Sequence, residues 1–337
     1  MNDLEREKFW NTLCELDGTN PIEEAKKLQE TITLPKKLYR YRPVSIKTLE
    51  ALQNNKLYFS TANYYDDPFD TFINVRINDI RPKLIELQNA DNADIIKLIE
   101  VLLKEIKGVN IDYDNALMMV NQLKGTLSNP QCADALEIYF RNIRNEIKKD
   151  TLSVCFSESP FNESLWLKYA NQHKGFSVEY DLYDDTKRLC GKQDKCKKCG
   201  INTIEMSLYP MYYSDDMYDA TNFAQFLVAC KQFGSDLTEE MLGKLQILFG
   251  NQAWEREKIT LIKKTCHKYD EEWRMIIHGS LLGPVVNEWI PSAIYLGLNM
   301  DSNEMNLISE IAKNAGVEKI YKCVITDAGK LDAVLIN

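Results

Sequence analysis

The chain has 337 residues, of which 45% are hydrophobic, and its formal net charge is −9. No apolar run approaches the ~20 residues that cross a bilayer, so no membrane span is predicted. The acidic charge argues against broad binding to nucleic acids or anionic membranes, although a local basic patch is compatible with it. The charged segment "MNDLEREKFW" lacks the apolar core of a secretory signal, and nine cysteines then predict a reducing, cytoplasmic setting with mostly free thiols.

Alternating and helical periodicities together predict an α+β fold for residues 1–337, as a single domain with small mixed sheets of short strands. A helical segment is expected at 1–35, and helical insertions are expected at 81–150 and 216–262, where apolar residues repeat at helical spacing. Strands are expected to join one mixed sheet system from six places: 37–42, 56–61, 152–157, 176–181, 272–278 and 293–298.

Two shorter helices carry clear end signals. "SIKTLEALQNN" follows the first predicted strand, and Ser45 is its expected N-cap. "MNLISEIAKNAG" predicts a helix that stops at Gly316 before a closing strand, "KIYKCVIT".

Two arginines alternate with two tyrosines on the first predicted strand, "KLYRYR". Arg40 and Arg42 lie on one face of this strand and the tyrosines, including Tyr41, on the other. Neighbouring guanidinium groups require carboxylates or phosphates. They therefore either pair with nearby aspartates or clamp a diphosphate, with the hydroxyls of Ser60 and Thr61 placing a ribose or an amide.

The turn "YYDDPFD" groups Asp66, Asp67 and Asp70 around one proline. Turn chemistry explains Asp before Pro, because Pro fixes φ there. The same carboxylates suit a hard cation, but their spacing is not that of a calcium loop.

The segment "CHKYDEEWRMIIHG" places Asp270, Glu272 and Arg274 on one face of a predicted strand. This arrangement is typical of a structural ion network. It equally suits an acid pair that grips ribose hydroxyls and stabilises a cationic sugar during glycosyl transfer. Trp166 or Trp273 would then supply an aromatic wall.

Three cysteines lie close together in "LCGKQDKCKKCG": Cys190, Cys196 and Cys199. Their spacing resembles part of a zinc knuckle, for which Cys155, Cys230 or His173 would supply a fourth ligand. The alternative is an exposed basic loop without metal.

These segments, in this order, resemble a widespread bacterial family defined as a domain of unknown function. The resemblance covers about residues 36–300. Its motifs stand here as Leu38-Tyr39-Arg40-Tyr41, Leu57-Tyr58-Phe59-Ser60, Asp66-Asp67-Pro68-Phe69-Asp70, Cys155-Phe156-Ser157, Trp166-Leu167-Lys168-Tyr169-Ala170, His173-Lys174-Gly175 and Asp270-Glu271-Glu272-Trp273-Arg274. The departure is Asp270, where Glu is commoner in the family pattern.

The segments "YRYR", "FSTA" and "DEE" also resemble, more distantly, the aromatic-Arg, Ser-Thr-Ser and Glu-x-Glu strands of mono-ADP-ribosyltransferases. The resemblance implies that Arg40 or Arg42 anchors the diphosphate of NAD and that Ser60 holds the nicotinamide ribose. It implies that Glu272 binds a ribose hydroxyl and stabilises the oxocarbenium ion, with Asp270 in place of the longer acid. We accordingly expect Glu272→Gln to lower turnover and to leave folding nearly intact.

The match has departures. About twenty residues separate the arginines from the serine strand, which is short, and about two hundred separate that strand from the acidic one, which is long. Ala62 stands where the third member of Ser-Thr-Ser would be.

The sequence thus supports three hypotheses. In the first, the protein binds NAD through Arg40, Arg42, Tyr41, Thr61 and Trp166 and transfers ADP-ribose to water or to a protein or nucleic acid, as a toxin-like or antiphage effector. In the second, it is a metal-dependent nuclease or other phosphoryl-transfer enzyme that uses Asp66, Asp67, Asp70 and Glu272 around Mg²⁺. In the third, it is a non-catalytic module that senses a nucleotide.

Overall fold

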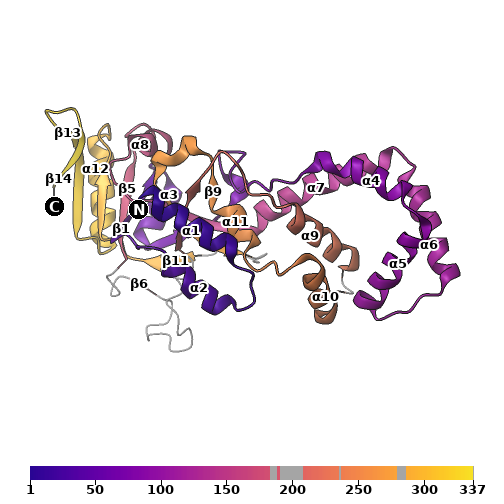
Figure 1. Cartoon of the computed structure of the whole chain (residues 1–337). Helices are drawn as coiled ribbons and strands as arrows, with labels where there is room; N and C mark the ends of the chain where they lie inside the picture. The colour runs from indigo at the N-terminus through magenta and orange to yellow at the C-terminus, as the bar shows by residue number, and fades with distance from the viewer. Residues whose placement is uncertain (183–187, 190–207, 235–236, 279–285, 337) are drawn as a thin grey trace.

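The computed structural model describes residues 1–182, 188–189, 208–234, 237–278 and 286–336. The α+β class expected from the sequence is confirmed, because helices and strands are both abundant and a mixed sheet organises the fold (Figure 1). None of the helices in these ranges is both long enough and apolar enough to cross a membrane.

Most of the described strands join one nine-stranded sheet in the order β14-β13-β12-β5-β1-β4-β10-β7, with β3 paired to β4 beside this path. The sheet is mixed because β12 and β13 run parallel, whereas the other pairs are antiparallel. Its strands are β1 (Lys37–Arg42), β3 (Ser60–Thr61), β4 (Thr151–Ser157), β5 (Phe176–Asp181), β7 (Leu208–Pro210), β10 (Glu272–His278), β12 (Ala293–Leu296), β13 (Lys319–Ile325) and β14 (Leu331–Leu335).

Three expectations about the strands need correction. Small sheets do not carry the fold, since one nine-stranded sheet dominates it. The strand expected at 56–61 is divided, because β2 (Lys56–Tyr58) pairs with β11 (Val286–Trp289) in a small sheet that also contains β6 (Arg188–Leu189), while β3 pairs with β4. The strand expected at 293–298 ends at Leu296, because Gly297 lies against the backbone of another segment.

A last pair of strands joins β8 (Tyr212–Tyr213) to β9 (Ile262–Lys263).

The helices follow the predicted periodicities. Ser45 caps α3 as expected, because its side chain accepts a hydrogen bond from the backbone N–H of Thr48, and Gly316 has a left-handed φ of 85° just after α12. The helices are α1 (Asp3–Glu15), α2 (Pro21–Gln29), α3 (Ile46–Gln53), α4 (Ile80–Asn89), α5 (Asn92–Leu102), α6 (Tyr113–Leu127), α7 (Gln131–Asp150), α8 (Glu163–Tyr169), α9 (Thr221–Phe233), α10 (Glu239–Phe249), α11 (Glu255–Thr260) and α12 (Ser302–Asn314).

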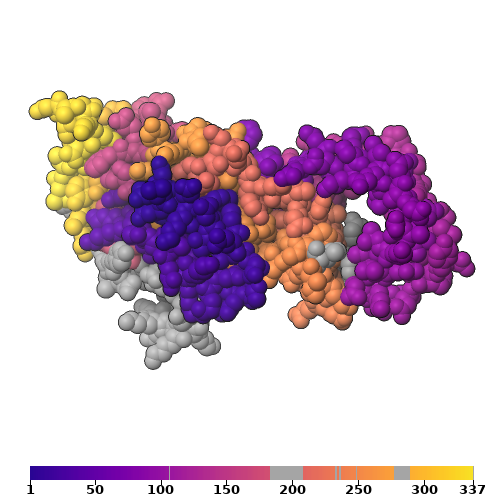
Figure 2. Space-filling model, viewed as in Figure 1, coloured from indigo at the N-terminus to yellow at the C-terminus, as the bar shows by residue number. Residues whose placement is uncertain are grey.

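Helices α4 to α7 form an arm that projects away from the sheet (Figures 1 and 2). The arm has a small core of its own, made by Ile95, Ile96, Ala116 and Val120. Helix α7 connects it to the body, because the second half of this helix buries apolar side chains against α9.

The two faces of the sheet differ in character. One face carries the main apolar core, to which α3 and α12 contribute Leu52, Ile308 and Ala312. The other face carries Tyr39 and Tyr41 beneath α8, together with the polar side chains of β4 and β10. Residues paired across two antiparallel strands point to the same face of the sheet. The strands that pair with β4 therefore determine which polar side chains lie together on this face.

The sheet opens between β1 and β4. These strands are paired at Tyr39 and Ser157, whereas β3 pairs with β4 further along, at Ser153 and Leu152. Neither strand is paired to β4 at Cys155, because the pairing of β1 lies on one side of this residue and that of β3 lies on the other. Side chains from β1, β3 and β4 therefore border a gap in the sheet rather than a continuous ladder.

Candidate functional site

A cavity of about 710 Å³ lies at this opening. It collects residues from β1, β3, β4, α8, β9, β10 and the turns before β10 and after β3. Six residues singled out from the sequence as site residues line it: Arg40, Tyr41, Arg42, Ser60, Asp270 and Glu272. Segments about two hundred residues apart in the chain thus border one space.

Arg40 and Arg42 are half-buried in the cavity wall, and among the described residues neither forms an ion pair with a carboxylate. Arg40 donates one hydrogen bond from Nη2 to the carbonyl oxygen of Tyr58, at 3.2 Å. Burial lowers the pKa of Arg40, and burial together with the charge of Arg40 lowers the pKa of Arg42 to about 9. Two guanidinium groups without a counter-charge favour a bound anion.

The aspartates of the "YYDDPFD" turn do not neutralise these arginines. Asp70 instead receives two hydrogen bonds from the guanidinium group of Arg274, one of them at 2.7 Å between Nη1 and Oδ1. Asp67 lies 3.1 Å from Nε2 of His267, and Asp66 is exposed. The pairing that the sequence offered as an alternative for Arg40 and Arg42 is therefore made elsewhere.

Glu272 lies in a buried ion network. Its Oε1 accepts from Nε of Arg274 at 2.6 Å, and its Oε2 accepts from Nζ of Lys263 at 2.9 Å. Although burial opposes ionisation, the two cations hold the pKa of Glu272 well below its ordinary value, and the carboxylates raise the pKa of Lys263 well above its own. The carboxylate of Glu272 is thus ionised, and each oxygen keeps one further lone pair for a ligand.

Asp270 completes the network through ion pairs, and its side chain forms no hydrogen bond with the residues that the structure describes. Its Oδ2 lies 3.5 Å from Nζ of Lys263 and 3.5 Å from Nδ1 of His267. The buried group of Asp70, Asp270, Glu272, Lys263 and Arg274 therefore has one more carboxylate than it has cations. The surplus negative charge favours a cationic group in this part of the cavity.

Sequence reasoning missed several residues that line the cavity. Tyr65, Tyr169 and His267 stand inside segments noted in the sequence, whereas Lys263 stands before the last of these segments, where no motif marked it. Tyr65 packs near the guanidinium group of Arg274, 5.2 Å from its ring centre. Cys155 also lines the cavity, but burial raises the pKa of its thiol to about 11, so it is protonated and is not a ready nucleophile.

Two expected ligand contacts lie outside the cavity wall. Trp166 is fully buried, donates from Nε1 to the carbonyl oxygen of Pro160 at 2.8 Å, and meets the ring of Tyr41 edge-on. The expectation that Trp166 walls the site is therefore wrong, because this side chain belongs to the core beneath α8. Thr61 is half-buried and pairs with Leu152 in the sheet.

The described residues give little support to the two metal hypotheses, structural zinc and catalytic Mg²⁺. The zinc candidates Cys190, Cys196 and Cys199 lie outside them. Within them, no group of three or more His, Cys, Asp and Glu side chains is arranged to hold a metal ion. Among the buried carboxylates of the cavity, the cationic groups of Lys263 and Arg274 occupy the space between the oxygens.

The position of Arg42 depends on a close backbone approach at Gly175. A Cβ atom at Gly175 would lie 2.2 Å from the carbonyl oxygen of Arg42 and 2.9 Å from Cα of Ala170. We expect Gly175→Ala to lower the free energy of unfolding by about 1–3 kcal/mol, the usual cost of overpacking, and to weaken anion binding by displacing Arg42. Urea unfolding and calorimetric titration with inorganic pyrophosphate would measure the two effects.

Gly243→Ala is the matched control, because nothing lies within 4 Å of a Cβ at this position in α10. Alanine is the better helix former, so this variant should gain up to about 1 kcal/mol and bind pyrophosphate like the wild type. Equal behaviour of the two variants would show that the contact at Gly175 does not hold Arg42.

Comparisons with models of known protein families, with curated proteins and with solved structures give no match to this chain.

Proposed function

We propose that the protein binds NAD in the large cavity and cleaves the bond between nicotinamide and ribose. The observation that carries this proposal is that one cavity wall contains both a pair of arginines and a group of buried carboxylates. Arg40 and Arg42 lack carboxylate partners among the described residues, and the wall also contains the ionised Glu272 within a group that has surplus negative charge.

The arginine pair suits a diphosphate. A guanidinium group donates two parallel hydrogen bonds to phosphate oxygens, and neither Arg40 nor Arg42 gives its donors to a carboxylate within the described chain. Both arginines are half-buried, so a bound diphosphate would meet them partly out of water, where such bonds are stronger. Binding would also relieve the unfavourable burial of two like charges.

The acidic part suits the nicotinamide end, because the oxidised nicotinamide ring carries a positive charge. The surplus carboxylate of the buried group and the rings of Tyr65 and Tyr169, which line the same cavity, both attract such a ring. Charge therefore orients the dinucleotide, with its cationic ring toward β10 and its diphosphate toward β1.

Glu272 would act on the ribose. When the bond between C1′ and the pyridine nitrogen breaks, its electron pair leaves with nicotinamide, and positive charge develops on the sugar. An ionised carboxylate stabilises that charge more in the transition state than in the ground state. Water then adds its oxygen to C1′ and loses a proton, or a nucleophile of a protein or nucleic acid takes the place of water.

The proposal includes the two further expectations from the sequence, that the core of the fold is like that of ADP-ribosyltransferases and that the protein acts in the cytoplasm. A role as a toxin-like or antiphage effector would follow from depletion of NAD or modification of a cellular target. Ser60, exposed on β3 at the cavity wall, would hold the nicotinamide ribose.

A second candidate function is nucleotide sensing without catalysis. It is favoured by one observation: both oxygens of Glu272 already accept hydrogen bonds from Arg274 and Lys263, which offsets the negative charge available to a developing cation. Release of nicotinamide distinguishes the two functions.

The test incubates the protein with NAD labelled in both halves, alone and with cell lysate, and measures released nicotinamide and transferred label. We expect nicotinamide release by the wild type and at least about tenfold slower release by Ser60→Ala, the cost of one hydrogen bond to a ribose hydroxyl. The hydroxyl of the exposed Ser60 makes no hydrogen bond with the residues that the structure describes, so this variant should fold normally. A wild type that binds NAD without releasing nicotinamide would favour the sensor, and one that does neither would overturn the proposal.

A further inference from the structure

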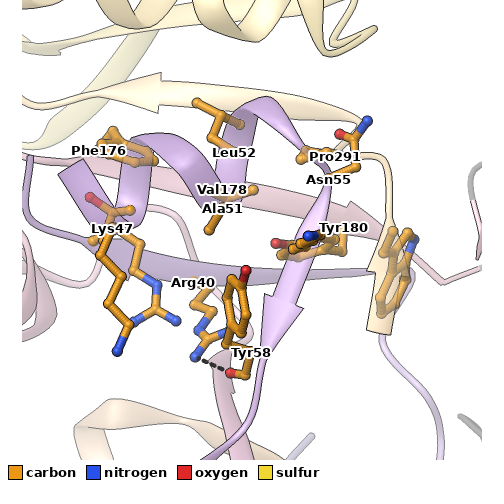
Figure 3. A pocket seen from close by; sticks show the side chains of 14 residues that line it. Arg40, Lys47, Ala51, Leu52, Asn55, Tyr58, Phe176, Val178, Tyr180 and Pro291 are labelled. Atoms are coloured by element: carbon orange, nitrogen blue, oxygen red, sulfur yellow. Dashed lines mark hydrogen bonds between the residues drawn. The ribbon is translucent and has the colours of Figure 1, made fainter. Parts of the chain in front are cut away.

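A second, smaller cavity lies behind the arginine pair. Its volume is about 170 Å³, and Arg40 and Arg42 line it as well as the large cavity. A closed cavity of about 150 Å³ accepts a benzene ring, so this space has room for one aromatic ring system. Figure 3 shows Arg40 reaching toward Tyr58 below helix α3, with Lys47 on the same side of the cavity.

The sheet explains why the two cavities share the arginines. Arg40 pairs with Val178 and Arg42 pairs with Phe176, so their side chains leave β1 on the face of these β5 residues. Val178 and Phe176 line the small cavity. Because the sheet is open between β1 and β4, the ends of the arginine side chains also border the large cavity on the other side. The arginine side chains therefore border both cavities.

The walls of the small cavity combine rings with positive charge. Its aromatic lining consists of Tyr58, Phe176, Tyr180 and Trp289. Its charged lining consists of Arg40, Arg42, Lys47 and Lys56, and no carboxylate side chain is among the described residues that line it. Within the described chain, neither lysine forms an ion pair. Rings of this kind stack on a nucleobase, and the cations select its phosphates.

The charge exceeds what a diphosphate requires. The diphosphate of NAD carries two negative charges, which the arginine pair alone would balance. Lys47 and Lys56 add two positive charges beside the arginines. A phosphate monoester contributes about −1.5 to −2 at pH 7 and would balance them.

We propose that the small cavity binds the purine nucleoside end of the dinucleotide, and that Lys47 and Lys56 make it prefer a purine nucleoside that bears an additional phosphate monoester. The inference rests on the proposed function, since the arginine pair must hold the diphosphate between the two ends. It assigns the nicotinamide half to the large cavity and the phosphorylated purine half to the small one.

The experiment titrates the full-length protein separately with AMP, adenosine 2′,5′-bisphosphate and nicotinamide mononucleotide, by calorimetry. The wild type should bind the bisphosphate at least about tenfold more tightly than AMP, the typical gain from a charge-assisted hydrogen bond. The double variant Lys47→Gln/Lys56→Gln should lose this preference and should bind nicotinamide mononucleotide as the wild type does. The exposed pair Lys83→Gln/Lys97→Gln on the arm removes the same charge elsewhere and should change nothing.

A second variant tests the cavity without altering its charge. Ala51 of α3 lines the cavity, and Figure 3 places it between Lys47 and Tyr180. Ala51→Trp should fill the space and weaken both adenosine ligands at least about tenfold, while nicotinamide mononucleotide still binds. Thermal unfolding of each variant would establish that it folds.

The outcomes separate this inference from the proposed function. If the protein cleaves NAD but neither Ala51→Trp nor the lysine double variant changes purine binding, the inference is overturned and the proposed function stands. If both variants weaken purine binding but the protein never releases nicotinamide, the small cavity is the purine site and the proposed cleavage is wrong. Binding of AMP and the bisphosphate with equal affinity by the wild type would refute the preference for an additional phosphate.

Discussion

Replacing Glu272 with Gln is expected to lower the free energy of unfolding by about 3–5 kcal/mol, the usual cost of removing one partner from a buried ion pair. Glu272 is 6% exposed, and its carboxylate accepts hydrogen bonds from Arg274 and Lys263, which are buried as well. The amide keeps the size of the side chain but leaves the positive charge of Lys263 with less compensation. Urea unfolding at neutral pH would measure the loss.

The pH dependence provides an independent check. The pKa of Glu272 in the folded protein lies below its ordinary value of 4.5, mainly because Arg274 and Lys263 favour the ionised form against the effect of burial. Its contribution to stability is therefore complete above about pH 5 and is lost as the pH falls through the acid range. The wild type should lose more stability than Glu272→Gln between pH 5 and about pH 3.

Glu23→Gln is the matched control, since Glu23 pairs with Lys26 on an exposed helix surface. That change should cost less than about 1 kcal/mol. An equally small cost for Glu272→Gln would mean that the buried network does not support the fold. The expected loss also corrects the expectation from sequence that this variant folds nearly as the wild type, so its turnover is to be compared at a temperature where both proteins are folded.

Replacing Arg42 with Met is expected to have opposite effects on stability and on binding. The ligand-free protein should gain about 1–2 kcal/mol, because Met keeps an apolar stem and removes a half-buried charge that has no carboxylate partner among the described residues. The affinity for NAD should fall at least about thirtyfold, because a charged donor to the diphosphate is lost. Urea unfolding and calorimetric titration with NAD would measure the two changes.

The sign of the pH effect follows from the lowered pKa. Burial, and then the charge of Arg40, lower the pKa of Arg42 from 12.5 to about 9. The folded protein is therefore penalised for holding this proton, fully below about pH 9 and less as the pH rises toward the ordinary value. The gain from Arg42→Met should accordingly be larger at pH 7 than at pH 10.

Arg81→Met serves as the control for this change. Arg81 lies on the arm and forms exposed ion pairs with Asp134 and Glu137. Its replacement should not raise stability and should not change the affinity for NAD. If Arg42→Met lost stability and bound NAD like the wild type, Arg42 would have a structural role in place of the proposed one.

Local periodicity was enough to predict the elements that position the arginines. The alternation in "KLYRYR" indicated a strand with Arg40 and Arg42 on one face, and β1 has this form. The N-cap at Ser45 and the stop at Gly316 were likewise predicted, because capping and left-handed backbone depend on neighbours in the chain. The sequence motifs also named most of the charged groups that border the cavity.

The partners of those charged groups were decided only by tertiary structure. Asp70 pairs with Arg274 rather than with Arg40 or Arg42, and Lys263 enters the network from a strand that no motif marked. Trp166 turned out to be buried, although its motif was noted. The physical reason is that a residue's own segment determines its backbone conformation and the face it occupies, whereas the register between distant strands determines which charges meet. Here the division of 56–61 between two sheets opened the gap beside β4, and no local pattern in the chain specifies that division.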